Sequence, residues 1–383
     1  MLNTKQRFDV LDGLRGVAAL LVVIYHITEG YAEGPLTHMP NHGYLAVDFF
    51  FLLSGYVVGY AYDDRVKLMG WKGFAKRRLI RLHPMIVFGT VLGMLLYYFS
   101  DGHPSFKDLS ETPWWLLLLV GLWCSTLIPV PASLDIRGWA DFNPLNGATW
   151  SLVWEYIGNI LYVTIFRRCS TLLLSLLTAC AAVFTLLLCF NIDPLGVLTE
   201  RTAAAYTVIG GWNFDADQVL IGFTRLLYPF IMGLLLSRFG NKVRLRGNFI
   251  ICSVLLLGLL CMPRIGGSDV ANFWMNGAYE AACILVFFPI ILLMGAGSVL
   301  NASPESRLCQ FLGRISYPLY VVHLPIVFVL MSWAASNPDA PTSTHVMAAL
   351  CTLTLAIAVA YGALKLYDEP VRKYFTNLLM RKK

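Results

Sequence analysis

Ionisable side chains inside apolar segments are the residues of this chain with the greatest capacity for chemistry. Such a group costs free energy in a bilayer unless it faces a partner or a wet cavity. Arg15 and His26 lie eleven residues apart in one apolar segment, so at about 100° per residue a helix returns them to within roughly 20° of the same face. Asp48 opens the next apolar segment at a similar depth. We predict that His26 and Asp48 meet across neighbouring helices.

A histidine beside a carboxylate is typical of general-base chemistry. Asp48 would fix the tautomer of the His26 imidazole, and the other ring nitrogen would then accept a proton from a hydroxyl group. Structural roles remain open alternatives, with His26 as a hydrogen-bonded packing residue and Arg15 as a cation that snorkels to the membrane interface. Sequence position alone does not separate these roles.

A cluster of arginines precedes the third apolar segment. The cluster consists of Arg77, Arg78 and Arg81 and is followed by Pro84. Guanidinium groups form forked contacts with phosphate. The cluster predicts a binding site for a phosphate-bearing donor. An ordinary cytoplasmic anchor that follows the positive-inside rule is the alternative interpretation.

Two further polar groups interrupt apolar segments. Glu155 follows Ser151 by four residues, so the two side chains lie on the same helical face. The candidate substrate contacts are Trp150, beside Ser151, and Tyr320 and His323 in a later apolar segment. Glu155 is a candidate catalytic carboxylate. Hydrogen bonding between helices explains Glu155 and His323 equally well.

The elements that must position these residues are predicted to be membrane-spanning helices. The chain is 57% hydrophobic and 14% charged, with a mean hydropathy of +0.64, whereas soluble domains carry about a quarter charged residues. We expect an all-α polytopic membrane protein with one domain over residues 1–383. Eleven apolar segments are candidate spans, near residues 13–29, 44–62, 85–100, 114–130, 150–166, 170–190, 219–237, 248–262, 277–297, 312–334 and 345–364.

The distribution of basic residues predicts the topology. The loop 28–43 contains no Lys or Arg, whereas the loop 63–84 is rich in both, which places the N-terminus in the cytoplasm. A cytoplasmic position is also indicated for the segment with Lys242, Arg244 and Arg246 and for the basic tail 365–383. Two cytoplasmic termini require an even number of crossings, so we expect ten, with the short segment 114–130 as a partial or re-entrant piece.

Several classes of protein are disfavoured. The apolar stretch after Lys5 and Arg7 contains His26 and no convincing cleavage pattern, which argues against a secretory signal peptide. The nine cysteines form no C-x-x-C pair, so we expect neither a metal site nor a disulfide framework. The net charge of +6 lies in short loops and is not the footprint of a nucleic-acid-binding protein.

Five motifs in order make the chain resemble acyltransferase family 3. They are LDGLRGVAALLVVIYHI with Arg15 and His26, VDFFFLLSGY with Asp48, RRLIRLHP with Arg78 and Arg81, TWSLVWEY with Glu155, and ISYPLYVVHLP with His323. The resemblance spans nearly the whole chain. The family often has two carboxylates after its W-S-L motif, where this chain has Trp154 and Glu155.

The resemblance implies O-acyl transfer from a cytosolic acyl-CoA, most commonly acetyl-CoA, to a hydroxyl of a sugar, polysaccharide or similar acceptor at or across a bacterial cytoplasmic (inner) membrane. By this resemblance His26 matches the essential histidine, Arg15 and Asp48 match required positions, and Arg78 and Arg81 match an R-x-x-R pair on the donor side. A proton-coupled transporter or a lipid or glycan flippase is the alternative class, in which the same ionisable groups relay protons or bind cargo.

Overall fold

A computed structural model describes residues 7–34, 37–198, 201–202, 204–239, 248–298, 300 and 303–380 of the chain. The basic residues Lys242, Arg244 and Arg246, like Lys5 and the last three residues of the tail, lie outside this described part. Within it the chain forms helices and no strand. This confirms the all-α polytopic fold.

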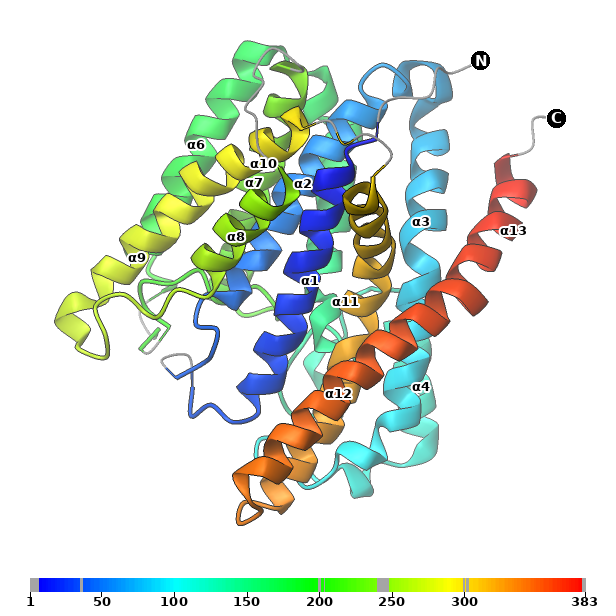
Figure 1. The fold of residues 1–383 in the computed structure, drawn as a ribbon, viewed down its shortest axis with the longest axis vertical. Helices are drawn as coiled ribbons and strands as arrows, with labels where there is room; N and C mark the ends of the chain where they lie inside the picture. Colours follow the sequence, from blue (N-terminus) through cyan, green and yellow to red (C-terminus); the bar gives the residue numbers. More distant parts are fainter. Residues whose placement is uncertain are drawn as a thin grey trace.

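Thirteen α-helices follow one another along the described residues (Figure 1). Short π-helical turns at Cys283–Phe287 and Leu364–Asp368 join α9 to α10 and α12 to α13. The helices are α1 (Asp9–Glu29), α2 (Ala46–Tyr62), α3 (Val66–Leu96), α4 (Trp114–Cys124), α5 (Trp150–Thr164), α6 (Thr171–Cys189), α7 (Ala216–Phe239), α8 (Phe249–Leu260), α9 (Phe273–Ala282), α10 (Phe288–Gly297), α11 (Pro304–Ser336), α12 (Thr342–Ala363) and α13 (Glu369–Met380).

Capping residues explain where several helices begin. The side chains of Ser170, Asn248 and Ser303 each accept a hydrogen bond from the backbone N–H three residues later, at the starts of α6, α8 and α11. These bonds satisfy donors that the first helical turn leaves without a partner. Pro304 occupies the first position of α11, where a missing N–H has no cost.

Eight helical segments of the described chain are long and apolar enough to cross a membrane. All eleven predicted segments contain helix. The segment suspected of being partial, α4, has eleven residues, so at ~1.5 Å per residue it extends only about half of a hydrocarbon core of roughly 30 Å. The twelve-residue α8 is also shorter than predicted.

Two pairs of tightly packed helices form the centre of the bundle. The pair α1 and α11 touch where a Cβ on Gly16 would collide with Leu312, and the pair α2 and α7 touch where a Cβ on Gly55 would collide with the backbone of Phe230. Small residues let helix backbones approach closely in a bilayer, where van der Waals packing drives association. The four helices α1, α2, α7 and α11 carry most of the polar residues of the candidate site.

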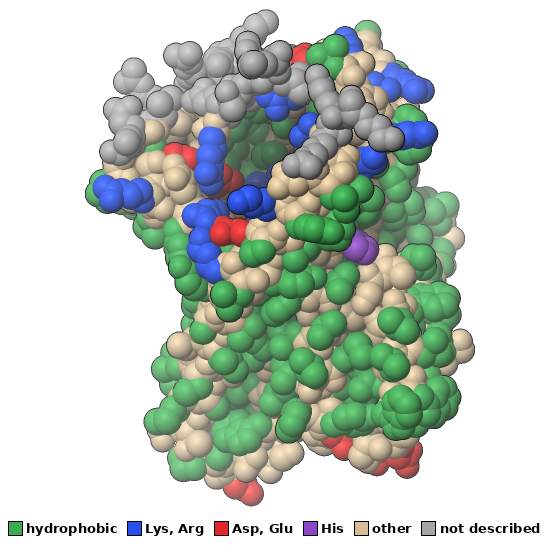
Figure 2. Space-filling model, turned by 90° about the vertical axis from the view of Figure 1, so that its right-hand side faces the viewer, with side chains coloured by type: hydrophobic (Ala, Val, Ile, Leu, Met, Phe, Trp, Pro, Cys, Tyr) green, Lys and Arg blue, Asp and Glu red, His purple; other side chains and the backbone are tan. Residues whose placement is uncertain are grey.

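The two ends of the bundle differ in charge. The start of α1 and the end of α13 lie at the same end of the molecule (Figure 1), as expected for an even number of crossings. Lys and Arg side chains gather at that end, above a broad band of hydrophobic side chains (Figure 2). We call it the basic end, and the opposite end the distal end.

Candidate active site

Three cavities follow one another along the axis of the bundle. The distal chamber, at the distal end, has a volume of about 370 Å³; the middle chamber has about 100 Å³, and the basic chamber, at the basic end, about 520 Å³. Val47 and Tyr320 line both the distal and the middle chambers, while Arg15 and Arg81 line both the middle and the basic ones. Because neighbours share wall residues, the cavities form a series between the two ends.

His26 lies near the distal end of α1 and lines the distal chamber. Its Nδ1 is 2.7 Å from Oε2 of Glu29, which lies three residues further along the same helix and therefore on the same face. Asp48 bonds to Arg225 with both carboxylate oxygens instead. The predicted pairing of His26 with Asp48 is therefore wrong, and Glu29 is the carboxylate beside the imidazole.

Asp48 and Arg225 form a fully buried ion pair between α2 and α7. The Arg225 Nη2 and Nε atoms lie 2.7 and 3.2 Å from the two Asp48 oxygens, and the two side chains are 1% and 0% exposed. A desolvated carboxylate gains more from this forked contact than from one hydrogen bond with a neutral imidazole, which explains the partner. Arg225 also donates to the carbonyl oxygens of Tyr44 and Gly210.

A second buried carboxylate fixes the wall of the distal chamber. The Tyr44 hydroxyl and the Asn276 amide donate to Oε1 of Glu280, and the backbone N–H of Val208 donates to Oε2 at 2.7 Å. Glu280 lies on α9 and has no exposed surface. Together with Arg225, it anchors the loop that leads to Ile209 and into the chamber.

The middle chamber contains the second predicted carboxylate, Glu155 on α5. Its Oε1 accepts a hydrogen bond from Arg78 at 2.6 Å and another from Ser54 at 2.9 Å. Glu155 therefore neutralises one arginine of the predicted donor site. Arg15 and Arg81 extend this chamber toward the basic end.

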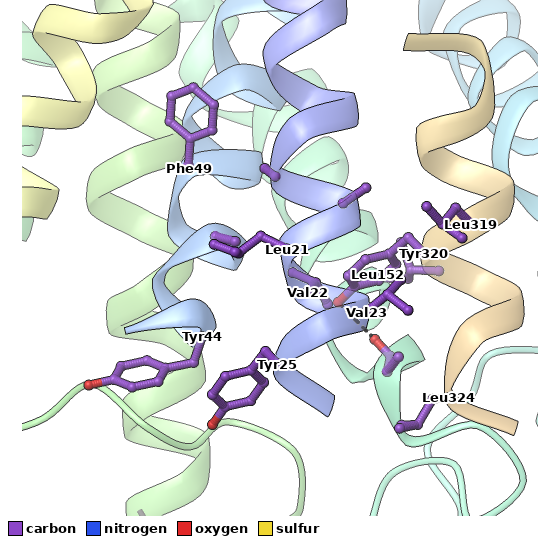
Figure 3. Close-up of a cluster of buried hydrophobic side chains, with 14 of the residues drawn as sticks. Leu21, Val22, Val23, Tyr25, Tyr44, Phe49, Leu152, Leu319, Tyr320 and Leu324 are labelled. Atoms are coloured by element: carbon purple, nitrogen blue, oxygen red, sulfur yellow. Dashed lines mark hydrogen bonds between the residues drawn. The ribbon is translucent and has the colours of Figure 1, made fainter. Parts of the chain in front are cut away.

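Tyr320 and His323 lie on α11, and Tyr320 lines both the distal and the middle chambers, whereas His323 lines none of the three. The Tyr320 hydroxyl lies 2.7 Å from the Ser151 hydroxyl and donates to the carbonyl oxygen of Ala148, so that it rests on the start of α5 (Figure 3). His323 is completely buried, and its ring centre lies 5.2 Å from that of His26. Its Nε2 has no hydrogen-bond partner among the described residues.

The loop between α4 and α5 reaches the distal chamber and is held by a buried arginine. Arg137 is 1% exposed, donates to the carbonyl oxygen of Pro144 and the hydroxyl of Ser100, and lies over the Phe328 ring at 4.2 Å. These contacts join the loop to α11. The predicted polar stretch after α4 therefore lines a cavity, through Trp139 and other residues.

The basic chamber contains the largest group of cations in the series. Its lining includes Arg7, Arg15, Arg65, Arg81, Arg314 and Arg372, with Asp12 and Asp368 as the acidic residues. This excess of positive charge suits an anionic ligand. Arg77 is exposed and lines none of the three chambers, so its predicted contact with the donor is not supported by its position.

The described residues contain no group of three or more His, Cys, Asp or Glu side chains placed to hold a metal ion. All nine cysteines are present as free thiols.

Comparison with known proteins identifies the family. A family model described as "Acyltransferase domain" matches residues 8–363 of the chain. The chain belongs to acyltransferase family 3. The five motifs from which this resemblance was predicted lie on α1, α2, α3, α5 and α11 and surround the three chambers.

Two relatives match nearly the whole chain. "Putative peptidoglycan O-acetyltransferase YrhL" of Bacillus subtilis is 24% identical over 369 residues, which cover 94% of this chain and 54% of that protein. "Putative O-acetyltransferase SACOL0978" of Staphylococcus aureus is 24% identical over 385 residues, which cover 95% of this chain and 57% of that protein. This chain thus spans about half the length of these two relatives.

A third relative covers a shorter stretch at higher identity. "Protein 2 in picA locus" of Rhizobium radiobacter is 33% identical over 171 residues, which cover 41% of this chain and 81% of that protein. No solved structure matches the chain.

Three charged residues of this acyltransferase family member were missed by the sequence analysis. Arg225 and Glu280 each interrupt an apolar segment, so the criterion that selected His26 and Asp48 would have selected them too. Glu29 carried a local signal, because a carboxylate three residues after a histidine shares its helical face. None of these signals shows which carboxylate pairs with which cation.

Proposed function

We propose that this chain is an acyl-CoA-dependent O-acyltransferase, with acetyl-CoA as the donor, that modifies a hydroxyl of a sugar, polysaccharide or related acceptor at a bacterial cytoplasmic membrane. The observation that carries the proposal is the series of chambers, with arginines at one end and a His26–Glu29 pair at the other. The positive-inside rule assigns the basic end to the cytoplasm, where coenzyme A thioesters are made.

The donor enters through the basic chamber. Its phosphates meet the excess of arginines there, including Arg15 and Arg81. The middle chamber, at about 100 Å³, is too narrow for a nucleotide but admits an extended arm. The thioester at the end of that arm thus arrives near Tyr320, where the middle and distal chambers meet.

The acceptor occupies the distal chamber, and His26 acts as the general base. Its Nε2 takes the proton of the acceptor hydroxyl while Glu29, on Nδ1, stabilises the imidazolium that forms. The hydroxyl oxygen attacks the thioester carbonyl, a C–O bond forms, and the C–S bond breaks. The proton on His26 then passes to the thiolate of the leaving coenzyme A, which balances the reaction.

The remaining predicted residues receive positioning roles in this proposal. Glu155 and Arg78 hold the wall of the middle chamber, Asp48 and Arg225 hold α2 against α7, and His323 packs beside His26. Trp150 and Tyr320 line the acceptor side.

Thioester consumption separates this proposal from a transporter. Purified protein in lipid nanodiscs is incubated with acetyl-CoA, labelled in the acetyl group, and a panel of glycans. We expect release of free coenzyme A and label in an alkali-labile ester that depends on the acceptor. Cargo movement in vesicles with the thioester intact would contradict the proposal and favour the transporter.

Replacement of Glu29 by Gln should lower kcat while binding of both substrates persists. The amide keeps the size of the side chain but provides no negative charge for the imidazolium, so we expect kcat to fall about 100-fold. The Michaelis constants should change less than twofold. Steady-state kinetics measure kcat and the two Michaelis constants separately. Glu33→Gln, in the loop after α1, provides the matched control.

Replacement of Arg81 by Ala should weaken donor binding. Loss of one charge-assisted contact with phosphate predicts a rise of about tenfold in KM for acetyl-CoA at low salt, and a smaller rise at high salt. Acetyl-pantetheine, which has no phosphate, should show no such change. Lys76→Ala removes an exposed cation of α3 outside the chambers and is the control; an equal effect on both thioesters would contradict the assignment.

A further inference from the structure

Three indole rings and the Asp141 carboxyl group line the distal chamber around the His26–Glu29 pair. Trp139, Trp150 and Trp212 line it, together with Asp141. Indole faces pack well against the C–H-bearing faces of ring compounds, and they leave hydroxyl groups free to bond at the rim. At about 370 Å³ the chamber lies within the usual range of small-molecule sites.

The chamber offers no uncompensated cation. Arg225 is the one Lys or Arg side chain of its lining, and it donates hydrogen bonds to both carboxylate oxygens of Asp48. The His26 ring is bonded to Glu29, and His38 to the Tyr25 hydroxyl. An anionic ligand buried here would lack a counter-charge, and an unpaired buried charge is strongly unfavourable.

Asp141 is held rigidly while its side chain stays free. On one side of Asp141, the Ala140 N–H donates to the Asp135 carboxylate at 2.9 Å. On the other side, the Phe142 N–H donates to the carbonyl oxygen of Trp212 at 2.7 Å. The Asp141 carboxyl makes no hydrogen bond or ion pair within the described residues, and it lies against Gly147, where a Cβ would come within 2.7 Å of Oδ2. The backbone thus presents an unused polar group to the chamber.

We infer that the distal chamber selects uncharged, ring-shaped polyhydroxyl acceptors over anionic ones, and that Asp141 is the specificity residue that hydrogen-bonds them beside His26. This inference rests on the proposed acyl transfer, because it names the acceptor class of that same site. It adds a residue outside the five family motifs.

The protonation of Asp141 supports this selection. Burial raises the pKa of its carboxyl to about 8, with further contributions from Asp135 and Glu29, which Arg137 opposes. Below pH 8 the group is therefore a neutral carboxylic acid that both donates and accepts hydrogen bonds. Above pH 8 it ionises and adds a negative charge to a chamber that already contains Glu29, His26 and His38. Discrimination against anions should then increase.

Direct binding tests the inference without any acyl transfer. The probes are neutral cello-oligosaccharides and the same oligomers oxidised at C6 to uronic acids, titrated by calorimetry into the protein in nanodiscs without donor. At pH 7 we expect the neutral oligomer to bind about a hundredfold more tightly than the uronate. That ratio should increase at pH 9.

Variants at Asp141 separate its role from general folding. Asp141→Ala should weaken binding of the neutral oligomer about tenfold, because one hydrogen bond is lost. Asp141→Asn should retain wild-type binding at pH 7 and abolish the change in the neutral-to-uronate ratio between pH 7 and 9. Asp269→Asn, in an exposed loop, should behave as wild type at both pH values.

Each outcome bears on the inference. Binding of the uronate as tight as that of the neutral oligomer, unchanged binding in Asp141→Ala, or no binding of the neutral oligomer overturns it. Selective, Asp141-dependent binding in a protein that leaves acetyl-CoA intact upholds the acceptor class and overturns the proposed transfer instead.

Discussion

Replacement of His26 by Ala is expected to lower acyl transfer by about a thousandfold or more. The general base supplies a factor of 10² to 10⁴ in rates of this kind, and His26 is the imidazole that lines the distal chamber with a carboxylate on its Nδ1. Its side chain and that of Glu29 are 21% and 29% exposed. The substitution therefore leaves no fully buried charge without a partner, and membrane insertion should be intact.

The measurement is acceptor-dependent release of coenzyme A by purified protein, alongside size-exclusion chromatography to confirm folding. His345→Ala is the matched control. His345 lies on α12, outside the three chambers, and its ring packs against the rings of Tyr31 and Trp333. Transfer by His26→Ala at a rate near that of the wild type would refute His26 as the base.

Replacement of Asp48 by Asn should destabilise the protein and not merely slow the reaction. Arg225 would be left as a buried cation with no counter-charge, and loss of one partner of a buried ion pair costs about 3–5 kcal/mol. The loop contacts that Arg225 makes through Tyr44 and Gly210 should loosen as well. Thermal unfolding in nanodiscs, followed by tryptophan fluorescence, measures the loss.

A double variant tests the physical reason for that loss. Asp48→Leu combined with Arg225→Met removes both charges, so it should be more stable than either single variant, although two backbone carbonyls lose a donor. If Asp48 acted mainly by orienting His26, Asp48→Asn would instead lower kcat at unchanged stability. Asp63→Asn, at the end of α2 in a partly exposed pair with Arg238, is the control.

Glu29 and Asp48 therefore have different partners in this protein. Glu29 bonds to the imidazole within one helix, and Asp48 bonds to a cation from another helix. In the proposed mechanism, proton transfer takes place at the partly exposed His26–Glu29 pair of α1, whereas the fully buried Asp48–Arg225 ion pair joins α2 to α7. A buried pair of this kind is suited to holding helices in register.

The sequence by itself determined the helical class, the membrane and the family. Long apolar runs require helices because a bilayer leaves no other partner for backbone groups, and the motifs around Arg15, His26, Asp48, Glu155 and His323 are local in the chain. It also indicated that α4 is too short to span. These properties follow from composition and from spacing along one helix, which do not depend on neighbouring helices.

Tertiary structure alone decided the partners of the charged groups and the shape of the site. Asp48 and Arg225 are 177 residues apart, and no periodicity within one segment shows which helix lies next to another or how each is rotated. The same holds for Asp141, whose loop reaches the chamber only because Arg137 and Trp212 anchor it. Each buried charge pairs with whichever opposite charge packing brings within reach, so the packing of the helices decides that Glu29 bonds to His26 and Asp48 to Arg225.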